Sequence, residues 1–177
     1  MTKKATNGNE DDFGRRLLAR LLEDPTRSVR AIATDLGSYR QRVWRHKRAL
    51  ERDRAVWGYT AVLDESRLGS VMYVVLMKMR PMDAPLADLI IKRQASSEFH
   101  RQEVRLINVL YVNGEYDWVV MFTARDHATA RRYYDSLRVA YEDYLIDKPH
   151  IIDVNFALVR EGKVNPGLGG LRDYVPK

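Results

Sequence analysis

The sequence of 177 residues predicts an α+β protein, with helices in its N-terminal third and strands alternating with helices in the remainder. Apolar residues recur at helical spacing over residues 13–50, whereas β-branched and aromatic runs prevail after residue 56. The balance of positive and negative residues also changes at about this point in the sequence. Residues 1–60 hold 14 Lys and Arg against 8 Asp and Glu, while residues 61–177 hold 16 of each. This asymmetry indicates that the first part contacts a polyanion.

The composition excludes several classes of protein. No run of about 18 apolar residues is present, so no membrane span and no membrane partner are expected. The chain has no cysteine, which removes disulfides, thiolate zinc sites and thiol nucleophiles. Residues 1–9 lack the apolar core of a secretory signal and are expected to be a disordered tail. A cytoplasmic location fits these absences.

No sequence pattern for catalysis or cofactor binding is found. His46, His100, His127 and His150 lack the spacing of metal ligands. The sequence contains no P-loop, no dinucleotide-binding glycine motif and no nucleophile elbow. We therefore expect no metal, no cofactor and no enzymatic activity.

The N-terminal third begins with two expected helices. Residues 9–23 form the first, which Pro25 ends. Its apolar stripe consists of Phe13, Leu17, Leu18, Leu21 and Leu22. The second helix is capped by Thr26 or Ser28 and ended by Gly37, because glycine tolerates the left-handed backbone that follows a helix. Its buried side consists of Val29, Ile32, Ala33 and Leu36.

The stretch from Ser38 to Glu51 predicts a third helix with a cationic surface. Ser38 as N-cap and Gln41 three residues later give its start the form of a capping box. Val43 and Leu50 form a narrow apolar face by which the helix docks, and the rest offers cationic side chains to an anionic partner. Two helices joined by a glycine turn, the second one basic, form the helix-turn-helix pattern, whose second helix enters the major groove of DNA.

The remainder of the chain, residues 71–160, predicts the element order β-α-β-β-α-β. Strands are expected at residues 71–79, 106–112, 116–122 and 151–159. Asp83 and Asp126 cap the two helices. Asn113-Gly114 between two β runs is a strong hairpin signal. This order is that of a ferredoxin-like sandwich.

Other segments connect or extend these elements. Residues 56–63 are β-branched and aromatic and predict a strand that forms the wing of a winged helix-turn-helix domain spanning residues 10–63. The polar residues 64–70 predict a linker, and residues 94–104 predict a loop. The glycine- and proline-rich residues 161–177 predict a C-terminal extension.

Both faces of the expected sheet are apolar. In the first strand, one face consists of Val71, Tyr73, Val75 and Met77, and the other of Met72, Val74 and Leu76. Two helices cover only one face of such a sheet, so the second face is more apolar than a solvated face should be. We therefore expect a homodimer that packs sheet to sheet. A two-fold dimer also suits recognition of palindromic DNA.

Residues 11–160 resemble the Lrp/AsnC (leucine-responsive, feast/famine) transcription regulators in order, spacing and motif, with wording most like archaeal members. The resemblance rests on the stretch DPTRSVRAIATDLGSYRQRVWRHKRALERDRAVWGYTAVLDESRLG and on the hairpin VNGEYDWVVMF. It implies a winged-helix DNA-binding domain and a regulatory domain that dimerises through its sheet. It further implies assembly of dimers into octamers, and binding of an amino acid or other small effector.

The resemblance also implies the site residues. Contacts of the recognition helix to double-stranded DNA would be made by Ser38, Tyr39, Arg40, Gln41, Arg42, Trp44, Arg45 and Arg48. Effector contacts would be made by Asn113, Gly114, Tyr116, Asp117 and Asp126. Two alternatives stay open, namely a siroheme-decarboxylase-like enzyme on the same fold and a small-molecule sensor that acts through a protein partner. Neither alternative needs the basic helix, so the DNA-binding regulator is preferred.

Overall fold

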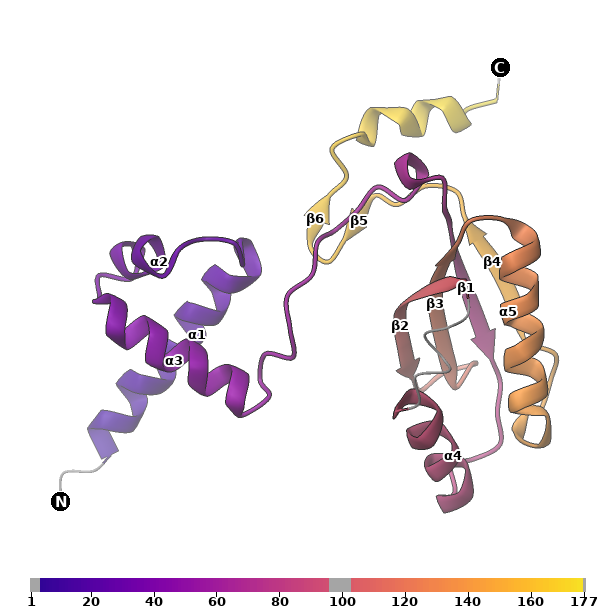
Figure 1. Cartoon of the computed structure of the whole chain (residues 1–177), viewed down its shortest axis with the longest axis horizontal. Helices are drawn as coiled ribbons and strands as arrows, with labels where there is room; N and C mark the ends of the chain where they lie inside the picture. The colour runs from indigo at the N-terminus through magenta and orange to yellow at the C-terminus, as the bar shows by residue number, and fades with distance from the viewer. Residues whose placement is uncertain (1–3, 96–102, 177) are drawn as a thin grey trace. The chain divides into compact units, whose positions relative to one another are not determined.

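The computed structural model describes residues 4–95 and 103–176, which divide into two compact units at Ala61 and Val62 (Figure 1). Unit 1 comprises the residues up to Ala61, and unit 2 the residues from Val62 onward. This division lies close to the expected end of the N-terminal domain at residue 63. Each unit has its own hydrophobic core, so each is described by itself.

Unit 1 contains the expected three helices. They are α1 (Lys4–Glu23), α2 (Val29–Asp35) and α3 (Arg40–Arg52). Their buried core consists of Phe13, Leu17, Leu21, Ile32, Ala33, Leu36 and Val43, with Val29 and Leu50 packed against it. All of these positions come from the apolar stripes predicted for the three helices, because residues three or four apart share one face of a helix.

The turn between α2 and α3 differs from expectation at one end. Ser28 caps α2 as predicted, accepting a hydrogen bond from the Ala31 N–H at 3.1 Å. Gly37 follows α2 with a φ of +59°, the left-handed conformation predicted for it. The capping box at the start of α3 is wrong. Tyr39 is the N-cap of α3 and makes no side-chain capping bond, because the Ser38 N–H closes the preceding turn onto the Ala33 carbonyl at 2.9 Å.

Two further expectations for the N-terminal part are corrected. Helix α1 begins at Lys4, so residues 4–9 are helical and do not belong to a disordered tail. The stretch 56–63 is not a strand in the described structure and forms no wing. A strand needs a neighbour to pair with its backbone groups, and no other described segment pairs with this one.

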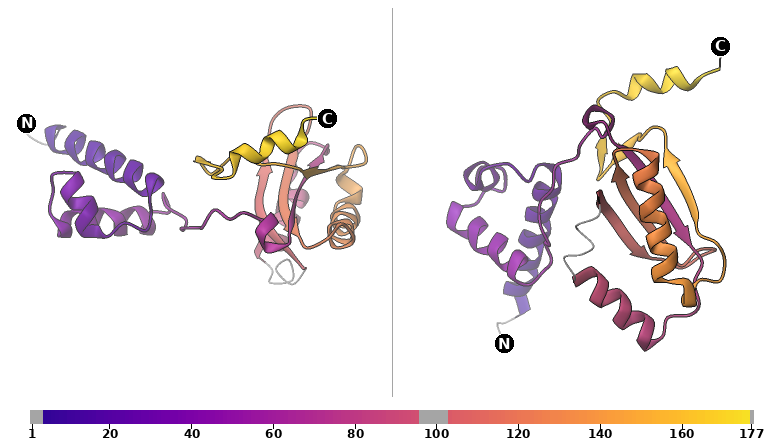
Figure 2. Two further views of the ribbon diagram at one scale, coloured as in Figure 1. Left: turned by 90° about the horizontal axis from the view of Figure 1, so that it is seen from above. Right: turned by 45° about the vertical axis from the view of Figure 1, so that its right-hand side comes forward.

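Unit 2 has the predicted ferredoxin-like order of elements (Figure 2). Its main elements are β1 (Val71–Met77), α4 (Ala84–Ala95), β2 (Val104–Tyr111), β3 (Trp118–Ala124), α5 (His127–Ala140) and β4 (His150–Val154). The four strands form an antiparallel sheet in the order β2-β3-β1-β4. Asp83 and Asp126 cap α4 and α5 as expected, accepting hydrogen bonds from Leu86 N–H and Thr129 N–H.

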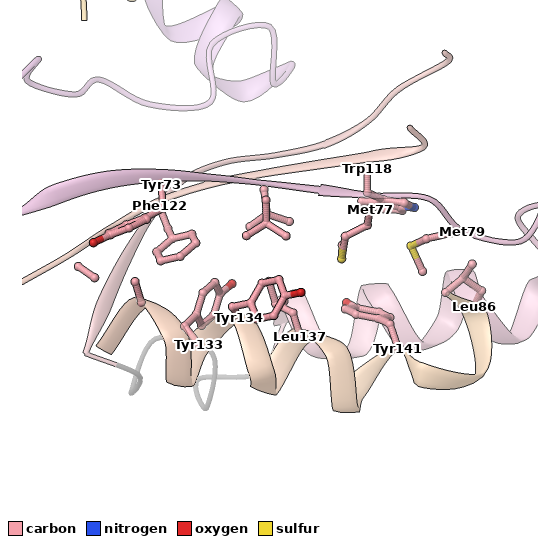
Figure 3. Packing of buried hydrophobic residues seen from close by; sticks show 14 residues of the cluster. Tyr73, Met77, Met79, Leu86, Trp118, Phe122, Tyr133, Tyr134, Leu137 and Tyr141 are labelled. Atoms are coloured by element: carbon pink, nitrogen blue, oxygen red, sulfur yellow. The ribbon is translucent and has the colours of Figure 1, made fainter. Parts of the chain in front are cut away.

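The core of unit 2 lies between the sheet and its two helices (Figure 3). Helix α5 contributes Tyr133, Tyr134, Leu137 and, at its end, Tyr141, while α4 contributes Leu86. The sheet contributes alternate residues, including Tyr73, Met77, Trp118 and Phe122. The Tyr134 hydroxyl donates a hydrogen bond of 2.7 Å to the Pro149 carbonyl, so a polar group in this core is satisfied.

No helix in the described part of unit 2 covers the opposite face of the sheet. The register places Val74 beside Met121 and Ile152 on that face. Its other apolar members are Met72, Leu76, Leu110, Val119 and Val154. Leu110 and Ile152 are 46% and 47% exposed. Met72, at one end of this face, is only 7% exposed. We call the other seven residues the open sheet face, and it is the apolar surface that the sequence predicted.

The hairpin between β2 and β3 is confirmed, but its turn is not a two-residue Asn-Gly turn. Residues 112–117 connect the strands, and Gly114 does not adopt a positive φ. Asp117 holds this longer loop, because its carboxylate accepts a hydrogen bond of 2.8 Å from the Met79 N–H and its own N–H donates to the Met77 carbonyl. Side-chain bonding of this kind allows a loop that the local dipeptide does not predict.

The segments expected to be irregular are partly ordered. Helix α4 takes in residues 94 and 95, β2 begins at Val104, and residues 96–102 of the expected loop lie outside the described residues. Strand β4 ends at Val154, short of the expected residue 159, because Val154 pairs with Met72 and only Val71 precedes Met72 in β1. The following chain forms β5 (Val159–Arg160), β6 (Lys163–Val164) and a 3-10 helix, η4 (Leu168–Tyr174).

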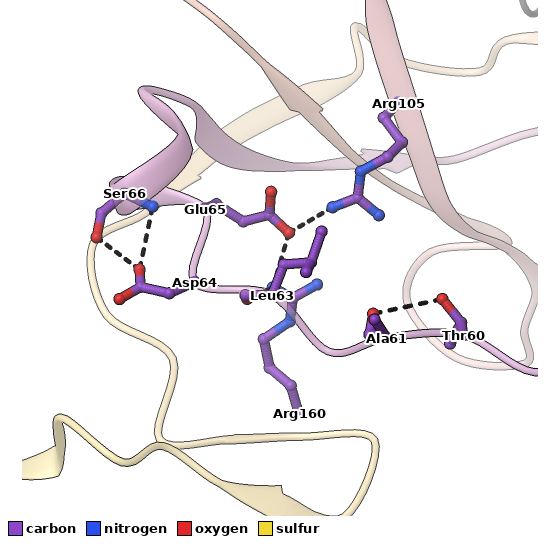
Figure 4. A network of polar contacts seen from close by, with 8 residues as sticks. All are labelled: Thr60, Ala61, Leu63, Asp64, Glu65, Ser66, Arg105 and Arg160. Atoms are coloured by element: carbon purple, nitrogen blue, oxygen red, sulfur yellow. Dashed lines mark hydrogen bonds and ion pairs between the residues drawn. The ribbon is translucent and has the colours of Figure 1, made fainter. Parts of the chain in front are cut away.

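The expected linker at residues 64–70 is anchored to unit 2 (Figure 4). It contains a short helical turn, η1 (Ser66–Leu68). Glu65 is buried, with 7% of its surface exposed, and its Oε1 accepts hydrogen bonds from Arg105 and from Arg160, the latter at 3.0 Å. A polar composition predicted a linker but could not reveal these partners, which lie far away in the sequence.

Candidate nucleic-acid interface

Helix α3 is held in unit 1 by its apolar side and turns its polar side to solvent. Val43 is fully buried and Leu50 packs against the core of unit 1. Six of the eight residues predicted to contact DNA share the opposite, exposed side of the helix or its N-terminal end: Tyr39, Arg40, Gln41, Trp44, Arg45 and Arg48. We call these six residues the exposed α3 face.

Arg42 does not belong to this face. Its guanidinium lies 4.2 Å from the centre of the Phe13 ring and 3.2 Å from Glu10 Oε1, so it packs against α1. His46 lies beside it, with Nε2 2.5 Å from Glu10 Oε2 and its ring at 4.8 Å from Phe13. Desolvation raises the pKa of Glu10, but His46 and the nearby arginines outweigh it and lower the pKa overall. Arg42 therefore stabilises the packing of α1 on α3.

Ser38 is also placed differently from expectation. Its Oγ is buried at the turn before α3, and no hydrogen-bond partner for it lies among the described residues. Spacing along the chain predicted its place next to the helix but not the direction of its side chain. Ser38 therefore supports the turn and does not extend the exposed α3 face.

The cations of the exposed α3 face are available to an anionic partner. In the described part of the chain, neither Arg40 nor Arg45 forms a hydrogen bond or an ion pair. Arg48 lies 3.6 Å from Glu51 and 5.7 Å from the centre of the Trp44 ring. Trp44 itself is 54% exposed. Such a surface can offer guanidinium groups to phosphates or base edges and an aromatic ring to apolar groups in a groove.

Helix α3 contacts the chain that follows it, which the sequence did not predict. The Lys47 ammonium lies 4.7 Å from the centre of the Tyr59 ring, and the Tyr59 hydroxyl donates a 3.1 Å hydrogen bond to Glu51. Burial, and then the bond to Glu51, raise the pKa of Tyr59. No local pattern predicts this pair, because the residues are separated by the end of the helix. The contact engages Lys47 and holds the start of the 56–63 segment against α3.

Four of the five residues predicted to bind an effector lie on the β2–β3 loop, and the fifth, Asp126, lies apart from them. Asn113 and Gly114 are exposed on the β2–β3 loop, and the Tyr116 hydroxyl lies 3.2 Å from His150 Nδ1. Asp117 holds the same loop, as described above. Asp126 lies beyond the other end of β3, more than about 20 Å away by the rise of an extended strand. It has a structural role there as the cap of α5.

The described histidines have partners within the protein. His46 contacts Glu10, His127 Nδ1 lies 2.9 Å from the Tyr73 hydroxyl, and His150 contacts Tyr116. Within residues 4–95 and 103–176 no group of three or more His, Asp or Glu side chains could hold a metal ion. In the same part of the chain, no helix is both long and apolar enough to cross a membrane.

Comparison with known proteins identifies the fold. No protein family and no curated protein sequence matches the chain, but solved structures do. An AsnC family transcriptional regulator from Agrobacterium tumefaciens matches with a TM-score of 0.62 and 18% identity, over 93% of this chain and 98% of that one. The chain has the fold of the Lrp/AsnC transcription regulators.

Two further structures extend this likeness. The leucine response regulatory protein LrpA of Mycobacterium tuberculosis matches with a TM-score of 0.66 and 18% identity, over 88% of this chain and 99% of that one. A transcriptional regulator from Neisseria meningitidis in complex with L-methionine matches with a TM-score of 0.62 and 15% identity, over 84% of this chain and 91% of that one. The Lrp/AsnC fold thus extends over most of both chains in each comparison.

Proposed function

We propose that this protein is a transcription regulator that binds a specific site on double-stranded DNA as a homodimer. The observation that carries the proposal is the exposed α3 face, which presents three arginines and two aromatic residues on the second helix of a helix-turn-helix. The positive charge of the chain, net +6, is concentrated in the same third of the sequence. The shared fold with Lrp/AsnC regulators supports the proposal.

The side chains of this face divide into two roles. In a helix-turn-helix the residues near the start of the second helix meet base edges, so Arg40, Gln41 and Trp44 are the proposed readers of sequence. Arg45 reads bases or holds phosphate according to the tilt of the helix. Arg48, one turn further on, is the proposed phosphate contact. Arginine pairs with guanine and glutamine with adenine in the major groove.

The open sheet face supports the proposed dimer. A contiguous surface of Val, Leu, Ile and Met side chains on a folded domain marks an interaction site. A second copy would cover it with an identical surface, and the two-fold symmetry would place two α3 helices on a pseudo-palindromic site. Further assembly of dimers into octamers and membership of the archaeal type stay predictions.

An amino-acid effector is part of the proposal. The Neisseria structure of the same fold holds L-methionine. The exposed tip of the β2–β3 loop, with Asn113 and Gly114, is the proposed contact in an assembly of several copies. The enzymatic alternative is not favoured, because the three described histidines are each engaged with a neighbouring side chain.

Substitution of α3 arginines tests the proposal. Arg45→Ala and Arg48→Ala should each weaken binding to the preferred DNA site by about tenfold to hundredfold, the loss expected for one arginine contact. Arg172→Ala, in the C-terminal extension, removes the same charge from unit 2 and should leave affinity nearly unchanged. The measurement is a gel-shift titration at fixed salt, because phosphate contacts make affinity salt-dependent. Equal affinities for all four proteins would contradict the proposal.

A further inference from the structure

Trp57 has the highest exposed fraction of the large apolar side chains in the described part of the chain, 96%. It lies within residues 56–59, which follow α3 and which we call the return loop. The other two tryptophans are less exposed, with Trp44 at 54% and Trp118 at 7%. Tryptophan is highly buried on average, so its ring is seldom left in water. The surroundings of Trp57 indicate what covers this ring.

The chain on either side of Trp57 is fixed to α3. Before it, Val56 is half-buried and its N–H donates a hydrogen bond of 3.1 Å to the Leu50 carbonyl. After it, the Tyr59 hydroxyl donates a hydrogen bond of 3.1 Å to Glu51. Because the return loop is anchored at both ends, the exposure of Trp57 is a property of the folded unit 1.

The return loop borders the exposed α3 face. Tyr59 contacts Lys47 and Glu51, which follow Trp44 by three and seven residues. Residues at this spacing lie on one side of a helix, so Tyr59 packs beside the side of α3 that carries Trp44. The Cα atoms of Trp57 and Tyr59 are at most about 7 Å apart, because two residues of extended chain span no more. Trp57 is therefore close to the surface that is proposed to contact DNA.

The chain around the return loop is cationic. Residues 44–59 hold five Lys and Arg against two acidic residues, a net charge of +3. Both acidic residues are engaged by neighbouring side chains, whereas the exposed Arg54 side chain forms no ion pair with another described residue. An aromatic ring among available cations suits a nucleic acid, which offers phosphates beside apolar sugar and base surfaces. A second copy of the chain would instead bring the same positive charge against this surface.

From this arrangement we propose that Trp57 is a second point of contact with DNA, beyond the exposed α3 face. The inference rests on the proposed function and deepens it. The 13 residues of α3 extend over roughly 20 Å. Half a turn of the duplex, which separates one groove from the next, is about 17 Å. With the start of α3 at base edges in the major groove, the Trp57 ring would meet the neighbouring minor groove, where apolar side chains wedge between base steps.

Acrylamide quenching of tryptophan fluorescence tests this contact on the full chain. The probe is mixed-sequence duplex DNA at saturating concentration, so the measurement does not depend on one particular site. In Trp44→Phe the remaining tryptophans are Trp57 and the buried Trp118, so acrylamide quenching reports on Trp57. We expect acrylamide to quench this variant readily without DNA, and the duplex to remove most of that quenching because it covers the ring.

Affinity measurements separate the ring from the charges around it. Trp57→Ala should weaken binding to the duplex about fivefold to hundredfold, the loss expected for one aromatic contact, and Trp57→Phe should restore part of it. The salt dependence of affinity should stay that of the wild type, because the ring carries no charge. Leu22→Ala is the matched control, since it removes a 78% exposed apolar side chain from α1 and should bind like the wild type.

Three outcomes would overturn the inference. Acrylamide still quenches Trp57 with the duplex bound, Trp57→Ala binds the duplex as tightly as Leu22→Ala, or Trp57→Ala dissociates the dimer in sedimentation without DNA. The last result would assign the ring to contact with a second copy. A wild type that binds no duplex refutes the proposed function, whereas a wild type that binds and leaves Trp57 exposed refutes only this inference.

Discussion

Two neighbouring arginines of α3 have different surroundings. Arg42 contacts Phe13 and Glu10 on α1, whereas Arg45, three residues later, forms no ion pair or hydrogen bond with the described residues. The sequence presents both as members of one cationic surface. Their different orientation depends on where α1 lies, and spacing within α3 does not encode that position.

Arg42→Ala and Arg45→Ala should therefore differ in what they damage. Arg42→Ala should lower the free energy of unfolding of unit 1 by about 1 kcal/mol, because it removes a cation–π contact and a partly exposed ion pair. Arg45→Ala should change stability by less than about 0.5 kcal/mol but weaken DNA binding. Urea unfolding followed by circular dichroism compares the two, and a larger stability loss for Arg45→Ala would contradict the assignment.

The contribution of Asp126 to stability depends on pH. The Thr129 N–H bonds the Asp126 carboxylate at the start of α5 and holds the pKa of Asp126 below the ordinary value of 3.8. The charged form therefore stabilises the fold above the pKa of the unfolded chain, and this contribution disappears as pH falls through the lower pKa of the folded state. Asparagine caps a helix almost as well but carries no charge.

Asp126→Asn should accordingly be less stable than the wild type at pH 7, and the difference should shrink as the pH falls below about 4. Asp126→Ala is the matched control, because it lacks the charge and also removes the cap, and it should be less stable than Asp126→Asn by the same amount at both pH values. Urea unfolding at pH 7 and at a pH below about 4 measures the free energy of unfolding of the wild type and of both variants. A difference between Asp126→Asn and wild type that does not depend on pH would contradict the assigned shift.

At the scale of elements, the stretches with strong apolar periodicity could be predicted from the sequence. The stripes of α1 to α3 and the alternation in β1 and β3 coincide with the two cores. Elements that depend on a distant partner could not be predicted from the sequence. The 56–63 stretch has the composition of a strand but no neighbour among the described residues, and β4 ends near the start of its partner β1. Likewise, the polar 64–70 stretch gave no sign that Glu65 meets Arg105 and Arg160.

Two glycines of unit 1 should respond in opposite ways to alanine. Gly37 joins α2 to α3 with a φ of +59°, where a Cβ is strained, so Gly37→Ala should destabilise unit 1 by about 1–2 kcal/mol. Gly14 lies inside α1 and an added Cβ would meet nothing within 4 Å, so Gly14→Ala should stabilise it by about 1 kcal/mol. Thermal unfolding of both variants is the measurement, and a shift of the same sign in both would contradict the turn geometry.

At the scale of the whole molecule, the open sheet face is the interface of the proposed dimer. Val74 lies near its centre, in register with Met121 on one side and Ile152 on the other. Val74→Lys would place a charge in the proposed interface and should weaken the dimer by more than about hundredfold, because an unpaired buried charge costs several kcal/mol. Ile91→Lys on α4, at a position that is 66% exposed, should leave the dimer intact.

Sedimentation velocity at micromolar concentration distinguishes these outcomes. The wild type and Ile91→Lys should sediment as dimers or larger assemblies, and Val74→Lys as a monomer. A monomeric wild type would refute the sheet-to-sheet dimer. This assembly was inferred from the apolar alternation of the strands, and the structure shows that the described helices leave that face uncovered.

We propose that a pair of exposed α3 faces reads DNA. Selection of bound sequences from a random DNA library tests it most directly. We expect the wild type to enrich a pseudo-palindromic motif whose half-sites are about one helical turn apart, ~10 bp, or a multiple of it. Arg40→Ala or Gln41→Ala should relax preference at single positions of each half-site. Enrichment of no motif by the wild type, or of an unchanged motif by every α3 variant, would contradict the claim.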